Sequence, residues 1–460
     1  MGNKKNAWLK FDNTKKEEIF SFCEGYKKYI SDCKTERESI KEAISLAEAK
    51  GYRDLKNVIS TGESLKAGDK VYYNNMDKSL ALFLIGSESI ESGMRIIGSH
   101  VDSPRLDLKP NPLYEDSELS LMETHYYGGV KKYQWVTIPL ALHGVVVKKD
   151  GTKIDVVVGE EETDPVVMVS DLLVHLASEQ QQKKATEVIA GEDLNILVGS
   201  MPLEGEEKEA VKANILKLLK EKYDFEEEDF MSAEIEIVPS GKARDLGLDR
   251  SMVAGYGHDD RICAYTSLLA LLETESVKKT SVVLLVDKEE VGSIGATGMQ
   301  SRFFENAVAE LMDRVGEYSE LKLRRALANS KMLSSDVTAA FDPNYAGAYE
   351  KKNSAFFGKG LAFAKYTGAR GKSGCNDANA EFVAWLRNVM DESDVSYQMA
   401  ELGKVDQGGG GTIAYILAEY GMEVIDCGVA LQNMHAPWEV ASKVDIYETM
   451  RGYKAFLIAE

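Results

Sequence analysis

Side chains that could bind metal or move protons occur at five places, each at a predicted strand end or helix start. Glu289 and Glu290 directly follow Asp287 and Lys288, at the end of the apolar run 281–286. Carboxylates at the end of a buried strand cost free energy unless a cation compensates them. In a glutamate pair, one carboxylate can ligate a metal while the other takes a proton from water. We therefore favour a functional role for this pair over surface decoration.

Three other segments carry histidine or aspartate in similar positions. His100 stands two residues before Asp102, after an apolar run, so both side chains of an extended chain would share one face. Asp102 could then fix the metal-binding tautomer of His100. Asp336 follows two serines at a possible strand end, and His435 follows the predicted strand 424–431. Taken singly, each has a structural alternative: His100 and Asp102 as a loop pair, Asp336 as a cap, and His435 as a polar loop residue.

The fifth place is the start of a predicted helix, where Asp259 follows His258. An acidic residue there ordinarily caps the helix and stabilises its dipole. The whole set is more informative than any member, because two imidazoles and three carboxylates suit two zinc-like ions when one carboxylate bridges. Two such ions could activate a water molecule and polarise a carbonyl group. The candidate ligands are His100, Asp259, Glu290, Asp336 and His435.

The surrounding sequence predicts the elements that would position these residues. An amphipathic helix is expected at 15–30, and Thr35 to Glu38 form a capping-box pattern before a second helix. After Gly241, strands and helices alternate, which predicts an α/β fold with a mostly parallel-containing mixed sheet sandwiched by helices. The strands are expected at 281–286, 361–366, 395–400 and 424–431, and the helices at 303–315, 378–390, 412–420 and 445–459.

Residues 103–241 have a different texture. Short β-rich runs at 133–147 and 153–158 flank the hairpin signal Lys149-Asp150-Gly151, and one helix is expected around 215–219. We interpret this section as an inserted β-rich domain. The sequence therefore predicts a catalytic α/β domain in two parts, 1–102 and 242–460, interrupted by an insertion at 103–241.

Composition narrows the class of protein. The 460 residues include 55 Lys and Arg against 75 Asp and Glu, a formal net charge of −20, which argues against nucleic acid or an anionic membrane as the main partner. The hydrophobic fraction of 44% provides for a substantial core. We see no signal peptide and no membrane-spanning run. Five scattered cysteines without a CxxC pair fit a reducing compartment, so we expect a cytoplasmic protein.

The ordered motifs resemble the aspartyl aminopeptidase family, which are dinuclear zinc aminopeptidases, from the N-terminal helices to the end of the chain. The motifs are His100-Val-Asp-Ser-Pro104, Asp259-Asp-Arg261, Asp287-Lys-Glu-Glu-Val-Gly-Ser293, Ser335-Asp-Val337 with Asp342-Pro-Asn-Tyr345, and Met434-His435.

By position, the resemblance assigns a role to each candidate. It implies that Asp259 bridges the two zinc ions, that His100 and Asp336 complete one site, and that Glu290 and His435 complete the other. Glu289 would be the general base and Asp102 would orient His100. Cobalt or manganese are possible substitutes for zinc. His258 stands where the family usually has an apolar residue, so we place it outside the metal shell.

The resemblance also predicts assembly. Family members place a histidine of the inserted domain into the active site of a neighbouring subunit, and His175 matches that position. A homodimer through the inserted domain would then be the smallest active unit, and dimers would form a hollow tetrahedral dodecamer. The alternative is that His175 is a buried histidine on an amphipathic stretch.

Substrate-binding residues are less sharply indicated. The family stretch that helps to hold an acidic side chain falls near 365–375, with a shift in spacing, where Lys365, Arg370 or Lys372 could pair with a carboxylate or face solvent. A loop from Asp406 to Thr412 contains four glycines, ending at Gly411, which let backbone approach a ligand closely. It is not a phosphate loop, because no Gly-Lys-Ser/Thr follows.

The resemblance implies an aminopeptidase that hydrolyses the N-terminal residue of peptides, with a preference for Asp or Glu. The nearest alternative is another cocatalytic zinc hydrolase: a broad or neutral aminopeptidase, a deacylase or a carboxypeptidase. A second alternative is a binding protein that kept the fold, although no candidate ligand is missing. A serine hydrolase is disfavoured, because no Gly-x-Ser-x-Gly elbow is present.

Overall fold

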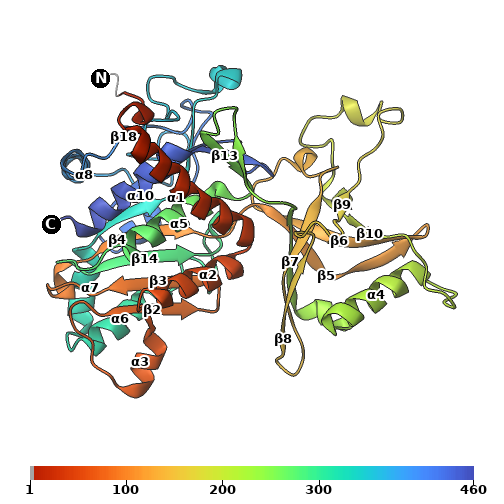
Figure 1. The fold of residues 1–460 in the computed structure, drawn as a ribbon, viewed down its shortest axis with the longest axis horizontal. Coiled ribbons are helices and arrows are strands. Elements are labelled where there is room, and N and C mark those ends of the chain that lie inside the picture. Colours follow the sequence, from red (N-terminus) through yellow and green to blue (C-terminus); the bar gives the residue numbers. More distant parts are fainter. Residues whose placement is uncertain (1–4) are drawn as a thin grey trace. The chain divides into compact units, whose positions relative to one another are not determined.

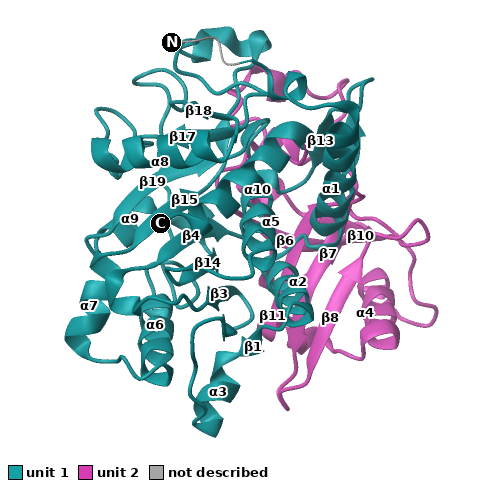
Figure 2. Cartoon of the chain, turned by 60° about the vertical axis from the view of Figure 1, so that its left-hand side comes forward, with its two compact units in different colours: residues 1–102, 243–434, 439–460 teal, residues 103–242, 435–438 magenta. Residues whose placement is uncertain are grey.

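The structure is a computed structural model that describes residues 5–460, and the chain forms two compact units (Figure 2). Unit 1 comprises the described part of 1–102 together with 243–434 and 439–460. Unit 2 comprises 103–242 and 435–438. The sequence predicts the inserted domain at 103–241, and the roles given to the two parts, catalysis and dimerisation, stay predictions.

The N-terminal helices of unit 1 are α1 (Asn13–Asp32), α2 (Glu36–Ala49) and the short α3 (Leu55–Thr61). The expected capping box at the start of α2 is confirmed. The Thr35 hydroxyl accepts a hydrogen bond from the backbone N–H of Glu38 at 3.2 Å, and the Glu38 carboxylate accepts one from the backbone N–H of Thr35 at 3.0 Å. Two of the backbone donors at the helix start are satisfied in this way.

The centre of unit 1 is a nine-stranded sheet, which confirms the expected mixed α/β architecture (Figure 1). The four central strands β14, β4, β15 and β19 run parallel, whereas β3 and β17 on either side are antiparallel to them. In sheet order the strands are β1 (Arg53–Asp54), β2 (Lys70–Asn75), β3 (Ser79–Leu84), β14 (Ser281–Val286), β4 (Arg95–His100), β15 (Lys331–Ser335), β19 (Glu423–Gly428), β17 (Leu361–Ala364) and β18 (Tyr397–Met399).

Both faces of this sheet are buried, because alternate residues of β14 enter two separate hydrophobic clusters. Val283 and Leu285 pack with residues of α5 (His258–Leu272), α8 (Ala380–Glu392) and α10 (Lys443–Ile458). Val282 and Leu284 pack with residues of α6 (Phe303–Arg314), α7 (Glu320–Ala328) and α9 (Ala414–Ala418). A strand covered on both sides has to be apolar along its whole length, which explains the uninterrupted apolar run at 281–286.

Three elements of unit 1 differ from the expectations, and in unit 2 the β-rich run expected at 133–147 becomes a strand only from Leu140. The helix expected at 412–420 corresponds to α9, which is only five residues long. Helix α7 is not expected from the sequence, because its buried residues Leu323, Ala326 and Leu327 stand among charged residues. The strand expected at 424–431 is two strands, β19 and β20 (Ala430–Gln432).

The neighbouring strand β15 is interrupted at the same level as the break between β19 and β20. β15 ends at Ser335 and continues after Asp336 as β16 (Thr338–Ala339), which pairs with β20 in a second, five-stranded sheet. A Cβ atom on Gly428 would lie 2.1 Å from the Asp336 carbonyl oxygen, so the two backbones approach too closely for any side chain there. Asp336 therefore stands where two strands leave the main sheet together. The remaining strands of the second sheet are β12 (Arg244–Leu246), β13 (Met252–Gly255) and β21 (Glu439–Ser442).

Unit 2 contains a seven-stranded sheet whose pairs are all antiparallel, with helix α4 (Ala210–Tyr223). The expected hairpin at 149–151 is confirmed by the pairing of β7 with β8. In sheet order the strands are β8 (Lys153–Val158), β7 (Leu140–Val147), β11 (Ala233–Pro239), β5 (Arg105–Asp116), β6 (Leu119–Tyr127), β10 (Ile196–Gly199) and β9 (Met168–Val169). Among the helices of residues 5–460, none combines the length and apolar character needed to cross a membrane.

Candidate metal centre

Several polar motifs of unit 1 meet at one edge of the central sheet. His100 is the last residue of β4 and pairs in register with Val286, the last residue of β14, and Asp336 follows β15. Because these strands are parallel neighbours, their carboxyl ends lie at the same edge. Asp259 and Asp260 reach this edge from the first turn of α5.

The imidazole of His100 is the centre of the group. Its Nε2 lies 3.1 Å from Oδ1 of Asp259, 3.8 Å from Oδ1 of Asp336 and 3.9 Å from Oε2 of Glu289. Its Nδ1 faces Asp102, at 2.9 Å from the carbonyl oxygen and 3.3 Å from the carboxylate. One ring nitrogen is thus held by Asp102, and the other points at three carboxylates.

Asp102 also holds the glutamate pair. Its side chain is fully buried, and its carboxylate oxygens accept hydrogen bonds from the backbone N–H groups of Glu289 at 3.1 Å and Glu290 at 3.2 Å. The same carboxylate therefore orients His100 and the turn that begins at Glu289. This geometry agrees with a supporting role for Asp102, although its assigned role stays a prediction.

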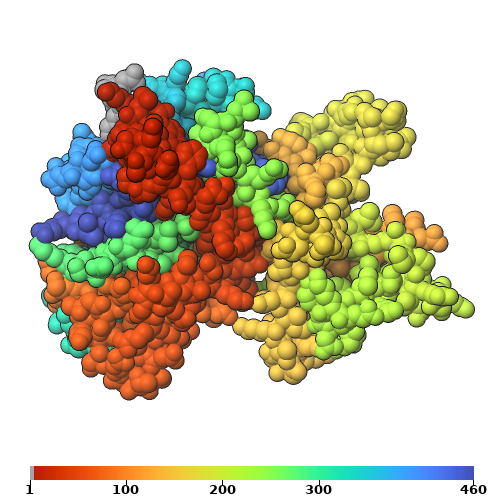
Figure 3. All heavy atoms as spheres, viewed as in Figure 1, coloured from red at the N-terminus to blue at the C-terminus, as the bar shows by residue number. Residues whose placement is uncertain are grey.

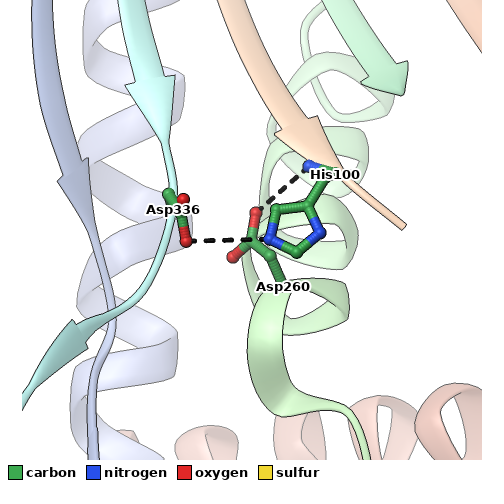
Figure 4. A group of neighbouring side chains, drawn as sticks. All are labelled: His100, Asp260 and Asp336. Atoms are coloured by element: carbon green, nitrogen blue, oxygen red, sulfur yellow. Dashed lines mark hydrogen bonds and ion pairs between the residues drawn. The ribbon is translucent and has the colours of Figure 1, made fainter. Parts of the chain in front are cut away.

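Two overlapping groups have ligand atoms that lie within 4.8 Å of one another. One consists of His100, Asp259 and Glu290, and the other of His100, Asp260 and Asp336. Figure 4 shows the second group, in which the Asp260 carboxylate accepts a hydrogen bond from the His100 backbone N–H at 3.3 Å. The family resemblance assigns the bridging role to Asp259 and gives Asp260 no role. The two consecutive aspartates were the available signal, but the sequence does not show which carboxylate points where.

The group is short of positive charge. Burial raises the pKa of Asp260 well above its ordinary value, and burial together with the charge of Asp259 raises that of Asp336. Burial raises the pKa of Glu289 to about 8, with Asp336, Asp102 and Asp259 adding to the effect and His100 opposing it. The pKa of His100 is also raised well above its ordinary value, because hydrogen bonds to Asp102, Asp259 and Asp336 outweigh the opposing effect of its burial.

Divalent cations would relieve this crowding. Oδ1 of Asp260 is buried and accepts no hydrogen bond from any residue in 5–460, so an acceptor inside the group is unused. Imidazole nitrogen together with carboxylate oxygen is a donor set that zinc accepts. The residues present therefore fit a metal centre.

The other histidines lie in different surroundings. His258 is buried, its Nδ1 lies 2.5 Å from the Tyr26 hydroxyl, and burial lowers its pKa to about 3. His435 belongs to unit 2, where its Nδ1 lies 2.9 Å from the Gly129 carbonyl oxygen, and its assignment as a ligand stays a prediction. His175 is exposed in unit 2, so the alternative of a buried histidine does not hold in the single chain.

The predicted substrate-binding residues lie in two contacting loops. Lys365 follows β17, which is antiparallel to β19 and ends at Ala364, level in register with Gly98 of β4. Lys365 and Lys372 each place Nζ 2.8 Å from a carboxylate oxygen of Asp377. Arg370 is exposed and forms no ion pair with a residue of the described chain.

Arg370 and Asp406 both line a cavity of about 220 Å³ between 366–372 and 401–408. The loops touch closely, since a Cβ atom on Gly409 would lie 2.5 Å from Cα of Ala369. Next to Gly411, the Thr412 hydroxyl donates a hydrogen bond to Asp426 of β19 at 2.6 Å. Among the described contacts, none joins Lys365, Arg370, Asp406 or Gly411 to the metal-binding groups.

The chain is similar to known proteins over almost its whole length. A family model described as aminopeptidase I zinc metalloprotease (M18) matches residues 29–457. A probable M18 family aminopeptidase 1 of Clostridium acetobutylicum is 66% identical over 454 residues, which is 98% of each chain. A crystal structure of an M18 aminopeptidase from Thermotoga maritima covers 99% of both chains with a TM-score of 0.95 and 45% identity. A yeast mApe1 dodecamer, at 20% identity, shares the fold with a TM-score of 0.77 over 95% of this chain and 96% of its own.

We expect the substitution Asp102→Asn to weaken zinc binding by about 10- to 100-fold, because the carboxylate that orients His100 would be replaced by a neutral amide. Competition with a chromogenic chelator measures the affinity. The control is Asp313→Asn, an exposed aspartate of α6, which should bind zinc as the wild type does. An unchanged affinity in a folded Asp102→Asn protein would contradict the supporting role.

Proposed function

The chain belongs to the M18 family of aminopeptidases, which are metallopeptidases, and from this premise we propose that it removes N-terminal residues from peptides with two zinc ions per subunit. The observation that supports this best is the convergence of the Asp259, Asp336 and Glu289 carboxylates on the Nε2 atom of His100, while Asp102 holds Nδ1. The sequence motifs imply a role at the metal centre for each of these residues.

We assign the two zinc ions to the ligands His100, Asp259, Glu290, Asp336 and His435, with Asp259 as the bridge. Asp259 is preferred to Asp260 because its Oδ1 lies 3.1 Å from the ligand nitrogen of His100. Asp260 instead accepts a hydrogen bond from the backbone of His100 and so supports that residue from behind. The assignment of His435 rests on the family motif alone.

Bound zinc ions would lower the pKa of a water molecule and polarise the scissile carbonyl. The protein's own part in the reaction falls mainly to Glu289, whose side chain is 15% exposed and whose backbone is held by Asp102. Glu289 takes a proton from the attacking water and passes it to the nitrogen of the leaving amine. His100 and Asp102 keep their geometry throughout, because each is buried and fixed by the other.

The substitution Glu289→Gln is expected to lower kcat by about 10²- to 10⁴-fold while the zinc content stays at the wild-type level, because the amide cannot accept the proton. Steady-state kinetics and elemental analysis of the same preparation give the two values. Glu17→Gln, at an exposed position of α1, is the matched control and should keep full activity. Retention of most activity in Glu289→Gln would refute the assignment of the base.

We further propose a preference for N-terminal Asp or Glu. Lys365 and Lys372 share Asp377 as a partner, whereas Arg370 lines a cavity and has no ion pair among residues 5–460. Arg370 is therefore the best supported of the three cations for binding a substrate carboxylate.

A panel of peptides that differ only in the first residue tests this preference, with zinc, cobalt or manganese added. We expect kcat/KM for Asp to exceed that for the isosteric Asn by about tenfold or more, since hydrogen bonds to charged groups contribute about 1.5–3 kcal/mol. Similar values for Asp, Leu and Ala would indicate a broad aminopeptidase instead. Cleavage of N-acetylated peptides would favour the deacylase or carboxypeptidase alternative, because an aminopeptidase needs a free α-amine.

We also propose that the active form is a homo-oligomer that uses unit 2 for dimerisation and reaches a dodecamer. Four large apolar side chains around His175 are 46–67% exposed, which is costly for a surface that stays in water. They are Leu172, Leu173, Val174 and Leu176. In Figure 3 this part of the chain, coloured yellow, forms part of the visible surface. A second copy of the chain would cover these residues, and His175 would then reach the active site of that second subunit.

The substitution Leu173→Asp should reduce the mass measured by light scattering and lower kcat, because a charge would have to be buried in the subunit interface. Met201→Asp, also in unit 2 and 71% exposed, lies outside the apolar segment and should leave both values unchanged. A full-sized, fully active Leu173→Asp protein would exclude this segment from the interface.

A further inference from the structure

A buried guanidinium without a hydrogen-bonded partner lies at the edge of the central sheet opposite to the metal centre. Arg95 is the first residue of β4 and only 4% of its surface is exposed. Its side chain forms no hydrogen bond or ion pair with any residue of the described chain, and its Nε is shielded from solvent. A buried cation in this state is expensive unless an anion compensates it.

A second cation stands directly beside it. Lys331 is the first residue of β15 and pairs in register with Arg95, so both side chains project from the same face of the sheet. Lys331 is partly buried, and its side chain likewise has no hydrogen bond or ion pair within 5–460. Burial lowers its pKa, and the charge of Arg95 lowers it further.

Aromatic rings of α8 form one wall of this pair. The Arg95 guanidinium carbon lies 5.0 Å from the centre of the Trp385 ring, and Nζ of Lys331 lies 5.5 Å from the same centre and 5.1 Å from that of Phe382. These ring faces attract cations and offset part of the cost of burial. They accept no conventional hydrogen bonds, so the donors of both side chains stay unused.

The nearest carboxylates are engaged elsewhere. Glu423 pairs in register with Lys331, but its carboxylate oxygens accept hydrogen bonds from Asn379 at 3.0 and 3.2 Å. Glu88 forms an ion pair with Lys279 at 2.9 Å. Glu88 and Glu423 act on the two adjacent cations only through space, so neither cation has a hydrogen-bonded counter-ion in the described chain.

We propose that Arg95 and Lys331 bind a small oxyanion, either inorganic phosphate or a carboxylate. The planar guanidinium offers the paired donors that fit such a group, and the less buried Lys331 provides the side open to solvent. The anion would replace the missing counter-ion and stabilise the folded state. This site is separate from the metal centre, since the five steps along β4 from Arg95 to His100 span roughly 16 Å.

Calorimetric titration of the full-length protein with sodium phosphate or sodium acetate, each at the same ionic strength as a sodium chloride reference, tests the site. We expect saturable binding of at least one oxyanion by the wild type and a thermal unfolding midpoint that rises with its concentration. In Arg95→Met, the dissociation constant should rise at least about tenfold and the anion-dependent shift should vanish. Without anion this variant should unfold no earlier than the wild type, since the uncompensated charge is gone.

The variant Lys331→Met tests the site a second time and should also bind the anion more weakly. Because this side chain is less buried than Arg95, its replacement should affect folding less. The control Lys208→Met removes one exposed positive charge of unit 2 and should bind the anion as the wild type does. If the anion instead bound to the zinc ions, all three variants would bind it as the wild type does. Equal binding by wild type and Arg95→Met, or an Arg95→Met protein destabilised regardless of anion, would overturn the proposal.

Discussion

The crowding of buried carboxylates around one imidazole is the constraint on which the rest of unit 1 depends. Asp259, Asp336 and Glu289 approach the same nitrogen of His100, while burial raises the pKa values of Asp336 and Glu289. Such an arrangement is unfavourable without added positive charge. The fold therefore has to hold these groups together against their repulsion until cations neutralise them.

The sheet supplies this rigidity through burial on both faces. β4, β14 and β15 are parallel neighbours between two hydrophobic clusters, so their ends cannot move independently. Asp102 then links two of these ends, because its carboxylate contacts His100 after β4 and the backbone of Glu289 and Glu290 after β14. The site is thus built on rigid elements, which favours precise geometry.

The opposite edge of the same strands has a different electrostatic character. There, Arg95 and Lys331 begin β4 and β15 as adjacent cations, whereas the carboxyl edge gathers acids. The two edges of this part of the sheet therefore carry excess charge of opposite sign. Both imbalances point to small ions as part of the folded protein, cations at one edge and an oxyanion at the other.

Much of this could be predicted from sequence, because apolar periodicity and strand-end motifs are local properties. The run 281–286 is strand β14, and the capping box at Thr35 begins α2 as expected. Local patterns failed where long-range contacts decide: the close approach of Gly428 to Asp336 divides the predicted strand 424–431, and α7 packs mainly against Ile90–Ser92, which lies far from it in the sequence.

The sequence by itself determined the candidate ligands, since histidines and acids at strand ends are visible as residue types in order. Only the tertiary structure decided how they point: that Asp259 faces Nε2 of His100 while Asp260 supports its backbone, and that Lys365 shares Asp377 with Lys372. It alone revealed Arg95 and Lys331 as neighbours, 236 positions apart in the chain and adjacent in register. The physical reason is that charge compensation depends on distances between strands, which no local pattern encodes.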